Sequence, residues 1–307
     1  MRYFFLLAFL LWIKADLPAR TNPVFSDVAV VSHARVSDDN KSGGGSDEPV
    51  SEVDRTIQQW LEEGLEIHQQ NSGIPSLISF YAGQQMGMPY VDGLLDEPDE
   101  ERLVVTLDGT DCVIYVEMSL ALTMTTLQGQ TSATDFRKNL AAVRYREGTV
   151  DGYGSRLHYF SDWLITNQDE GLLTLLFQED ELPGIGPVRF MTGNRERYRH
   201  LAGNDRHWRQ IREAEERLDD RVLRYIPADR IPEFEPHFQS GDVLAFVTTI
   251  DKLDISHTGL VLMDGDRAGF YHASLTGSVI TDPGTIHEYV QRREAIRGIV
   301  VARLSAS

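Results

Sequence analysis

Four β-prone segments crowd the last third of the chain, and they constrain its fold more than any other feature of the sequence. They cover residues 242–249, 257–263, 269–273 and 299–304. Aspartate- and glycine-containing turns separate them, and consecutive strands with short connections pair in antiparallel fashion. The sequence therefore predicts an antiparallel sheet near the C-terminus.

Mostly helical segments are predicted to precede this sheet. Ser51 can cap a first helix, whose apolar residues recur at helical spacing up to Gly73. The further predicted elements are a helix over 77–86, an extended segment at 89–90, a strand over 103–107, a helix over 112–124, a strand around 157–160 and a charged helix over 205–222. Helices first and a β-meander later predict an α+β domain with N-terminal helices packed on an antiparallel sheet.

Three regions are expected along the chain. Residues 1–15 have a basic start and an apolar run too short to span a bilayer, which is typical of a secretory signal peptide. Residues 16–50 are rich in Ser, Asp and Gly and indicate a flexible acidic linker. Residues 51–307 form the folded domain. We expect an exported protein, periplasmic or extracellular, without stable membrane insertion after signal removal.

The charge of the chain argues against one class of partner. Asp and Glu number 47 against 29 Lys and Arg, which gives a formal net charge of −18. Nucleic acids are bound through basic side chains that displace counterions from the phosphates. Nucleic acid is therefore not an expected partner.

Cys112 is the single cysteine of the chain and follows Thr110-Asp111, where a helix is predicted to begin. The free N–H groups and positive pole of a helix N-terminus favour a thiolate and can stabilise an oxyanion. Cys112 is therefore a candidate nucleophile, although a buried and inert cysteine is the commoner outcome. Asp111 is interpreted first as the helix cap and second as a residue of the site.

Two histidines stand in consecutive predicted strands. His257 and His272 flank the turn at Met263-Asp264-Gly265-Asp266, so an antiparallel hairpin can bring them together. A thiol hydrolase needs a base that also protonates the leaving amine, and a second group that orients that base. The pair fits both roles.

At this point the sequence resembles a known family. The strings that carry the likeness are Gly87-Met88-Pro89-Tyr90, Asp111-Cys112, Gly241-Asp242-Val243, Ser256-His257-Thr258-Gly259 and His272-Ala273-Ser274. In this order they resemble the NlpC-type branch of the papain-like cell-wall hydrolases. Further strings are similar to its N-acetylmuramoyl-L-alanine amidase-like subfamily: Arg102-Leu103-Val104-Val105, Cys112-Val113 with Tyr115-Val116-Glu117, the block from Arg156 to Trp163, and Leu253-Asp254-Ile255-Ser256-His257.

The resemblance implies a papain-like fold and a cysteine amidase over residues 51–307. Its substrate would be a bacterial muropeptide, cut at the amide between N-acetylmuramic acid and L-alanine. The sugar would be either the ordinary or the 1,6-anhydro form. Cys112 would be the nucleophile, His257 the general acid and base, and His272 the residue that orients His257. The substrate-binding candidates are Tyr90, Asp111, His158, Tyr159, Trp163 and Ser256, although an aromatic cluster is at least as often core. No metal or cofactor is implied.

Three alternatives stay open. A D,L-endopeptidase would use the same residues to cut within the stem peptide. A zinc amidase would cut the same bond with metal ligands, but the sequence has no H-E-x-x-H pattern, and His200 and His207 lie in an arginine-rich segment better interpreted as surface. A non-catalytic muropeptide-binding module would keep the fold without the reaction.

Overall fold

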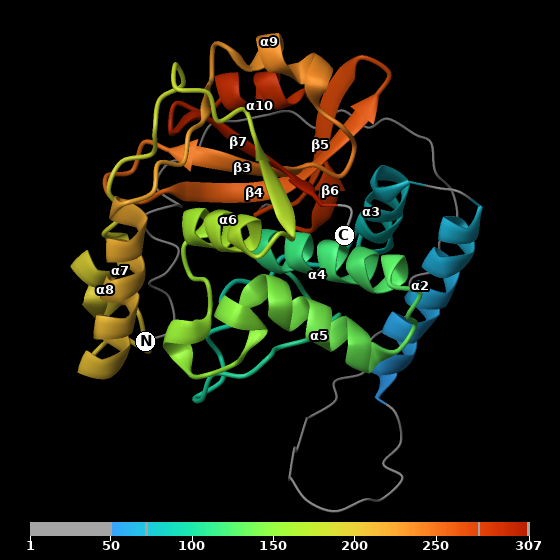
Figure 1. The fold of residues 1–307 in the computed structure, drawn as a ribbon, viewed down its shortest axis with the longest axis horizontal. Coiled ribbons are helices and arrows are strands. Elements are labelled where there is room, and N and C mark those ends of the chain that lie inside the picture. Colours follow the sequence, from blue (N-terminus) through green and yellow to red (C-terminus); the bar gives the residue numbers. More distant parts are fainter. Residues whose placement is uncertain (1–50, 71–72, 276, 306–307) are drawn as a thin grey trace, which may run out of the picture. The chain divides into compact units, whose positions relative to one another are not determined.

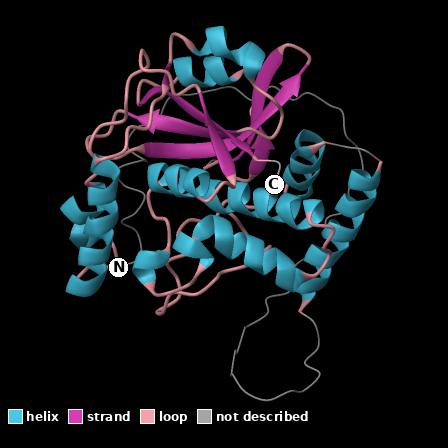
Figure 2. Ribbon diagram, in the orientation of Figure 1, coloured by secondary structure: helices cyan, strands magenta, loops and turns pink. Residues whose placement is uncertain are grey.

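An antiparallel sheet forms the centre of the domain (Figures 1 and 2). The computed structural model describes residues 51–70, 73–275 and 277–305, and the predicted signal peptide and linker lie outside them. Within these residues the sheet has seven strands in the order β1-β7-β3-β4-β5-β6, with β2 also paired to β7. The strands are β1 (Leu173–Leu176), β2 (Ile226–Pro227), β3 (Val243–Thr248), β4 (Ile255–Asp264), β5 (Arg267–Ala273), β6 (Val279–Thr281) and β7 (Ile296–Leu304).

Helices cover both faces of this sheet (Figure 1). The α-helices are α2 (Glu52–Gln69), α3 (Ile74–Gln84), α4 (Cys112–Leu127), α5 (Ala133–Arg144), α6 (Phe160–Asp169), α7 (Phe190–Gly193), α8 (Asp205–Asp219), α9 (Ile231–Phe234) and α10 (Ile286–Gln291). Short 3₁₀ turns are η1 (Arg146–Gly148), η2 (Tyr153–Ser155), η3 (Arg195–Arg197) and η4 (Glu235–His237). The α+β class and the predicted C-terminal strands are confirmed.

Two predicted strands are wrong. Residues 103–107 form no ladder, and the carbonyl of Val104 instead accepts a 2.7 Å hydrogen bond from the Arg144 guanidinium. Residues 157–160 lead into α6, which begins at Phe160. Leu157, Tyr159 and Phe160 are buried, and Leu103, Val105 and Leu107 are partly buried against the same core, so local propensity gives way to tertiary packing.

Each face of the sheet carries its own apolar cluster. Strand β3 is buried throughout, and its side chains alternate between the faces as a strand requires. Val243 and Ala245 join the cluster that contains α4, whereas Leu244 and Phe246 join the one that contains α10. The strand is therefore sandwiched between helices.

Helix α4 lies against the sheet and is buried along most of its length. Its Glu117 forms a 2.7 Å ion pair with Arg144 of α5, and both side chains are only 1% exposed. Because Arg144 also binds the carbonyl of Val104, this pair links α4, α5 and the segment that leads to the start of α4.

No helix in the described part of the chain is long and apolar enough to cross a membrane.

Candidate active site

A cleft of about 240 Å³ opens at the N-terminus of α4. Its lining consists of Asp96, Cys112, Val113, Tyr153, Arg156, His158, Tyr159, Phe160, Met191, Tyr198 and residues 253–258. Five predicted site residues are thus brought together here: Cys112, His158, Tyr159, Ser256 and His257. A larger cavity of about 530 Å³, lined by Pro75, Phe238 and Asp266 among others, contains none of them.

Cys112 is the first residue of α4, and Asp111 is its N-cap. The Asp111 carboxylate accepts hydrogen bonds from the backbone N–H groups of Val113 and Ile114, at 2.9 and 2.8 Å. The preferred interpretation of Asp111 as the cap is therefore confirmed. These bonds fix the first turn and thereby the place of the Cys112 sulfur.

The expected lowering of the thiol pKa is not found. Burial and, after it, the nearby Asp111 raise the pKa of Cys112 to about 12, although the backbone N–H groups of Thr258, Cys112 and Val113 act in the opposite direction. The Asp111 carboxylate already occupies the positive pole of the helix, and desolvation of the sulfur outweighs the remaining donors. The resting sulfur is a neutral thiol.

The two histidines meet as predicted. Nε2 of His257 and Nδ1 of His272 share a hydrogen bond of 2.8 Å. The sulfur of Cys112 accepts a hydrogen bond from the backbone N–H of Thr258, the neighbour of His257. Because Nε2 of His257 is engaged by His272, its Nδ1 is the ring nitrogen left for the thiol.

Both imidazoles are neutral at pH 7. Burial, His272 and Arg293 lower the pKa of His257 well below its usual value. Burial and Arg293 lower the pKa of His272 to about 4. A neutral imidazole of His257 can accept the proton of a neutral thiol that lines the same cleft.

Gly259 is what lets the two histidine strands approach. A Cβ on this residue would lie 2.4 Å from the carbonyl oxygen of Tyr271 in β5. We expect Gly259→Ala to displace β5 and to lower the free energy of unfolding by about 1–3 kcal/mol. Activity would fall as well, because His272 is on the displaced strand. Thermal unfolding and turnover of the variant measure both effects; Gly186→Ala, where a Cβ meets nothing within 4 Å, is the control, and equal behaviour of the two variants would contradict the prediction.

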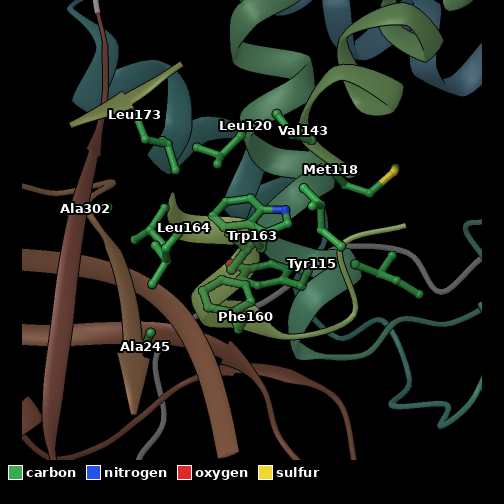
Figure 3. Close-up of a cluster of buried hydrophobic side chains, with 14 of the residues drawn as sticks. Tyr115, Met118, Leu120, Val143, Phe160, Trp163, Leu164, Leu173, Ala245 and Ala302 are labelled. Atoms are coloured by element: carbon green, nitrogen blue, oxygen red, sulfur yellow. The ribbon is translucent and has the colours of Figure 1, made fainter. Parts of the chain in front are cut away.

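Three predicted substrate-binding residues lie outside the cleft lining: Asp111, which caps α4, Trp163 and Tyr90. Trp163 is fully buried in the core among Tyr115, Leu120 and Leu164 (Figure 3), so its prediction as a cleft residue is wrong. The Trp163 side chain instead packs between α6 and α4. Tyr90 is partly buried and lies within electrostatic range of Cys112, on the segment that bridges to Thr110.

His158 and Tyr159 do line the cleft, but structural hydrogen bonds occupy their polar atoms. Nε2 of His158 donates to the carbonyl of Tyr153 at 2.7 Å, and burial lowers the pKa of this imidazole to about 3. The hydroxyl of Tyr159 donates to the buried Glu215 at 2.8 Å and accepts from the Met191 N–H. These residues can offer ring surface to a substrate.

Sequence reasoning missed the far end of the cleft. Arg156 binds Asp96 at 2.5 Å and Glu101 at 3.1 Å, so the guanidinium holds the acidic segment against the cleft. Burial works against the Asp96 charge, but Arg156 and the nearby histidines hold its pKa below the usual range. Arg156 stood in a string used for the family resemblance, whereas no pattern pointed to Asp96.

The histidines of the zinc alternative have other roles. The His207 ring stacks on the Tyr153 ring and the His200 ring is tilted against it, each with a centroid distance of 5.1 Å. Their ring nitrogens bond to the backbone carbonyls of Asp96 and His200, respectively, at 2.9 Å. Across the described ranges, 51–70, 73–275 and 277–305, no group of three or more His, Cys, Asp or Glu side chains could hold a metal ion.

Fold, cleft and the cysteine–histidine arrangement together define a class of protein. The model of the N-acetylmuramoyl-L-alanine amidase-like family matches residues 81–299, and the chain belongs to this family. No curated protein matches the chain.

Solved structures share the fold, and one of them is named as an amidase of this kind. An N-acetylmuramoyl-L-alanine amidase from Bacteroides uniformis is 27% identical, with a TM-score of 0.71 over 76% of this chain and 99% of its own. A protein described as a putative xylanase from Bacteroides fragilis is 30% identical, with a TM-score of 0.68 over 73% of this chain and 99% of its own. A Legionella pneumophila protein, 18% identical with a TM-score of 0.59 over 82% of this chain and 94% of its own, shares the fold.

Proposed function

We propose that the chain is a cysteine amidase of the NlpC-type papain-like branch, which hydrolyses the amide between N-acetylmuramic acid and L-alanine in muropeptides. The observation that carries the proposal is that Cys112 and His257 line one cleft and that His257 is hydrogen-bonded to His272. Family membership and the Bacteroides uniformis amidase support peptidoglycan as the substrate.

Acylation begins from the neutral pair. Nδ1 of His257 takes the thiol proton as the sulfur of Cys112 attacks the lactyl carbonyl. The backbone N–H of Cys112 stabilises the oxyanion, and His257 then gives its proton to the leaving nitrogen. The C–N bond breaks, the stem peptide departs with a free L-alanine amine, and a thioester to the lactyl group remains.

Deacylation uses the same base. Nδ1 of His257 takes a proton from water, whose oxygen attacks the thioester, and returns it to the departing sulfur. The sugar leaves with a free lactyl carboxyl group. For this cycle Nε2 of His257 carries its own proton and donates it to Nδ1 of His272, which holds the imidazole in the useful tautomer.

The place of action is part of the proposal. Residues 1–15 would direct export and be removed, residues 16–50 would link, and residues 51–307 would carry the activity in the periplasm or outside the cell. Sequencing of the N-terminus of the protein recovered from a culture tests this point: a mature chain that starts after residue 15 supports it, and an intact Met1 in the cytosol contradicts it.

The reaction is tested with a defined 1,6-anhydro-muropeptide and the same muropeptide in its reducing form, with products identified by mass spectrometry. We expect a free stem peptide that begins with L-alanine, with formation lost in Cys112→Ala and unchanged by a chelator. A cut within the stem would identify the endopeptidase instead. Sensitivity to the chelator alone would support the zinc mechanism, and binding without any cut would support a binding module.

A further inference from the structure

Tyr289 of α10 lies directly against the histidine pair, although no sequence pattern singled it out. Its ring centroid is 6.4 Å from that of His257 and 5.8 Å from that of His272. The side chain is only 6% exposed, and it packs between Phe246 and Phe270 on the same face of the sheet. The Tyr289 ring therefore packs against both imidazoles.

The guanidinium of Arg293 packs on the Tyr289 ring. The guanidinium carbon of Arg293 lies 3.5 Å from the centroid of the Tyr289 ring, and its Nη1 donates to the Tyr289 carbonyl at 3.0 Å. A capping box between Thr285 and Glu288 fixes the start of α10, which places both residues. Arg293 itself is exposed, and it contacts the same buried ring that packs against both imidazoles.

The titratable groups near the histidines come from α4, from α10 and from the segment that follows β6. Tyr289 of α10 packs against both imidazoles, and Cys112 at the start of α4 lies within electrostatic range of Tyr289. Asp282, which follows β6, lies within electrostatic range of Tyr289 and is bound by Arg292 at 3.4 Å. The Arg293 cation lowers the pKa of both imidazoles, and His272 also lowers the pKa of His257.

We propose, on the basis of the proposed amidase reaction, that Tyr289 and Arg293 are positioning residues: Tyr289 orients the histidine pair, and Arg293 disfavours the imidazolium form of His257. The device serves both half-reactions. His257 stays neutral, and so ready to accept the thiol proton, down to acidic pH. Once protonated, it is a strong acid toward the leaving amine.

The charge effect has a definite sign. A cation near an imidazole lowers its pKa, because the protonated form is repelled. Activity that needs neutral His257 is lost as the pH falls through that pKa. Removal of the cation raises the pKa, and the acid limb of the activity profile then moves to higher pH.

The charge is tested with Arg293→Gln, Arg293→Lys and the matched control Arg297→Gln, which removes an exposed cation from the same segment. We expect the acid limb of kcat/KM for the muropeptide to move up by about 0.5 to 1 pH unit in Arg293→Gln. Arg293→Lys restores the wild-type profile, and Arg297→Gln leaves it unchanged. An unshifted acid limb in Arg293→Gln, or an equal shift in Arg297→Gln, overturns the role of the charge.

The ring is tested with Tyr289→Phe and Tyr289→Leu. Phe keeps the ring and its cation contact, and we expect its kcat to stay within about twofold; Leu removes the ring, and we expect kcat to fall at least tenfold while KM stays within about twofold. Unchanged kcat in Tyr289→Leu overturns the positioning role. If this variant does not fold, the exposed Arg293 variants still decide the charge effect.

One readout is independent of turnover. Titration of the His257 and His272 imidazoles by ¹⁵N NMR, in wild type and Arg293→Gln, reports their pKa values directly. A rise in the variant supports the Arg293 inference even if the muropeptide is not cut, and unchanged values contradict it even if the amidase reaction is confirmed.

Discussion

Replacement of Cys112 by Ala is expected to lower muropeptide hydrolysis by at least about 10⁴-fold. The reason is that the sulfur forms the covalent bond to the lactyl carbonyl, and no other side chain in the cleft lining is a thiol. Asp111 still caps α4 in this variant, so the fold and the cleft persist. Product formation by mass spectrometry and thermal unfolding measure the two properties separately.

The matched variants sharpen this test. Cys112→Ser replaces the thiol with a hydroxyl, which is a weaker nucleophile. This variant is therefore expected to be nearly as inactive as Cys112→Ala. Both variants should still bind the muropeptide in calorimetry, because each changes only the Cys112 side chain and leaves the rest of the cleft lining as it is. Turnover of Cys112→Ala near the wild-type rate would rule out the cysteine mechanism.

The largest effect on stability is expected from the Glu117–Arg144 pair. Glu117→Ala leaves the Arg144 guanidinium buried, 1% exposed, without its counter-charge. Breaking a buried ion pair in this way costs about 3–5 kcal/mol, which corresponds to a fall in melting temperature on the order of 10 °C. Differential scanning calorimetry of the variant measures it.

The comparison for this variant is an exposed pair. Asp169→Ala removes the surface partner of Arg221, which is bound at 2.6 Å but open to solvent. We expect its melting temperature to stay within about 2 °C of wild type, because water screens and solvates both charges. Equal losses in Asp169→Ala and Glu117→Ala would show that burial of the pair is not what matters.

Much of the fold could be predicted because local signals agreed with tertiary structure. Ser51 caps α2, and its side chain accepts from the Asp54 N–H as the sequence suggested. The hairpin of β4 and β5 could be predicted from its turn residues, and this placed His257 beside His272. Helix α4 could be predicted from its capping residue and the long apolar run that follows it, although its apolar residues face every direction.

The failures have a shared physical cause. Residues 103–107 and the block that ends at Trp163 are β-prone or aromatic because they pack against the core. Side chains of this kind are buried in strands, loops and helices alike, so their type does not identify the backbone structure. The thiol pKa failed for a related reason: the sequence showed the helix terminus but not the desolvation around Cys112. Asp96, Tyr289 and Arg293 come from segments remote in sequence, so their approach to the cleft depends on the whole fold.

The protonated state of Cys112 determines which covalent inhibitors can reach it. Reagents that rely on a standing thiolate find a neutral sulfur and react slowly. A nitrile or aldehyde that first fills the cleft instead presents a carbon for attack while His257 removes the proton. Selective inhibitors of this protein are therefore expected to owe their potency to recognition by the cleft, with the reactive group kept mild enough to spare ordinary surface thiols.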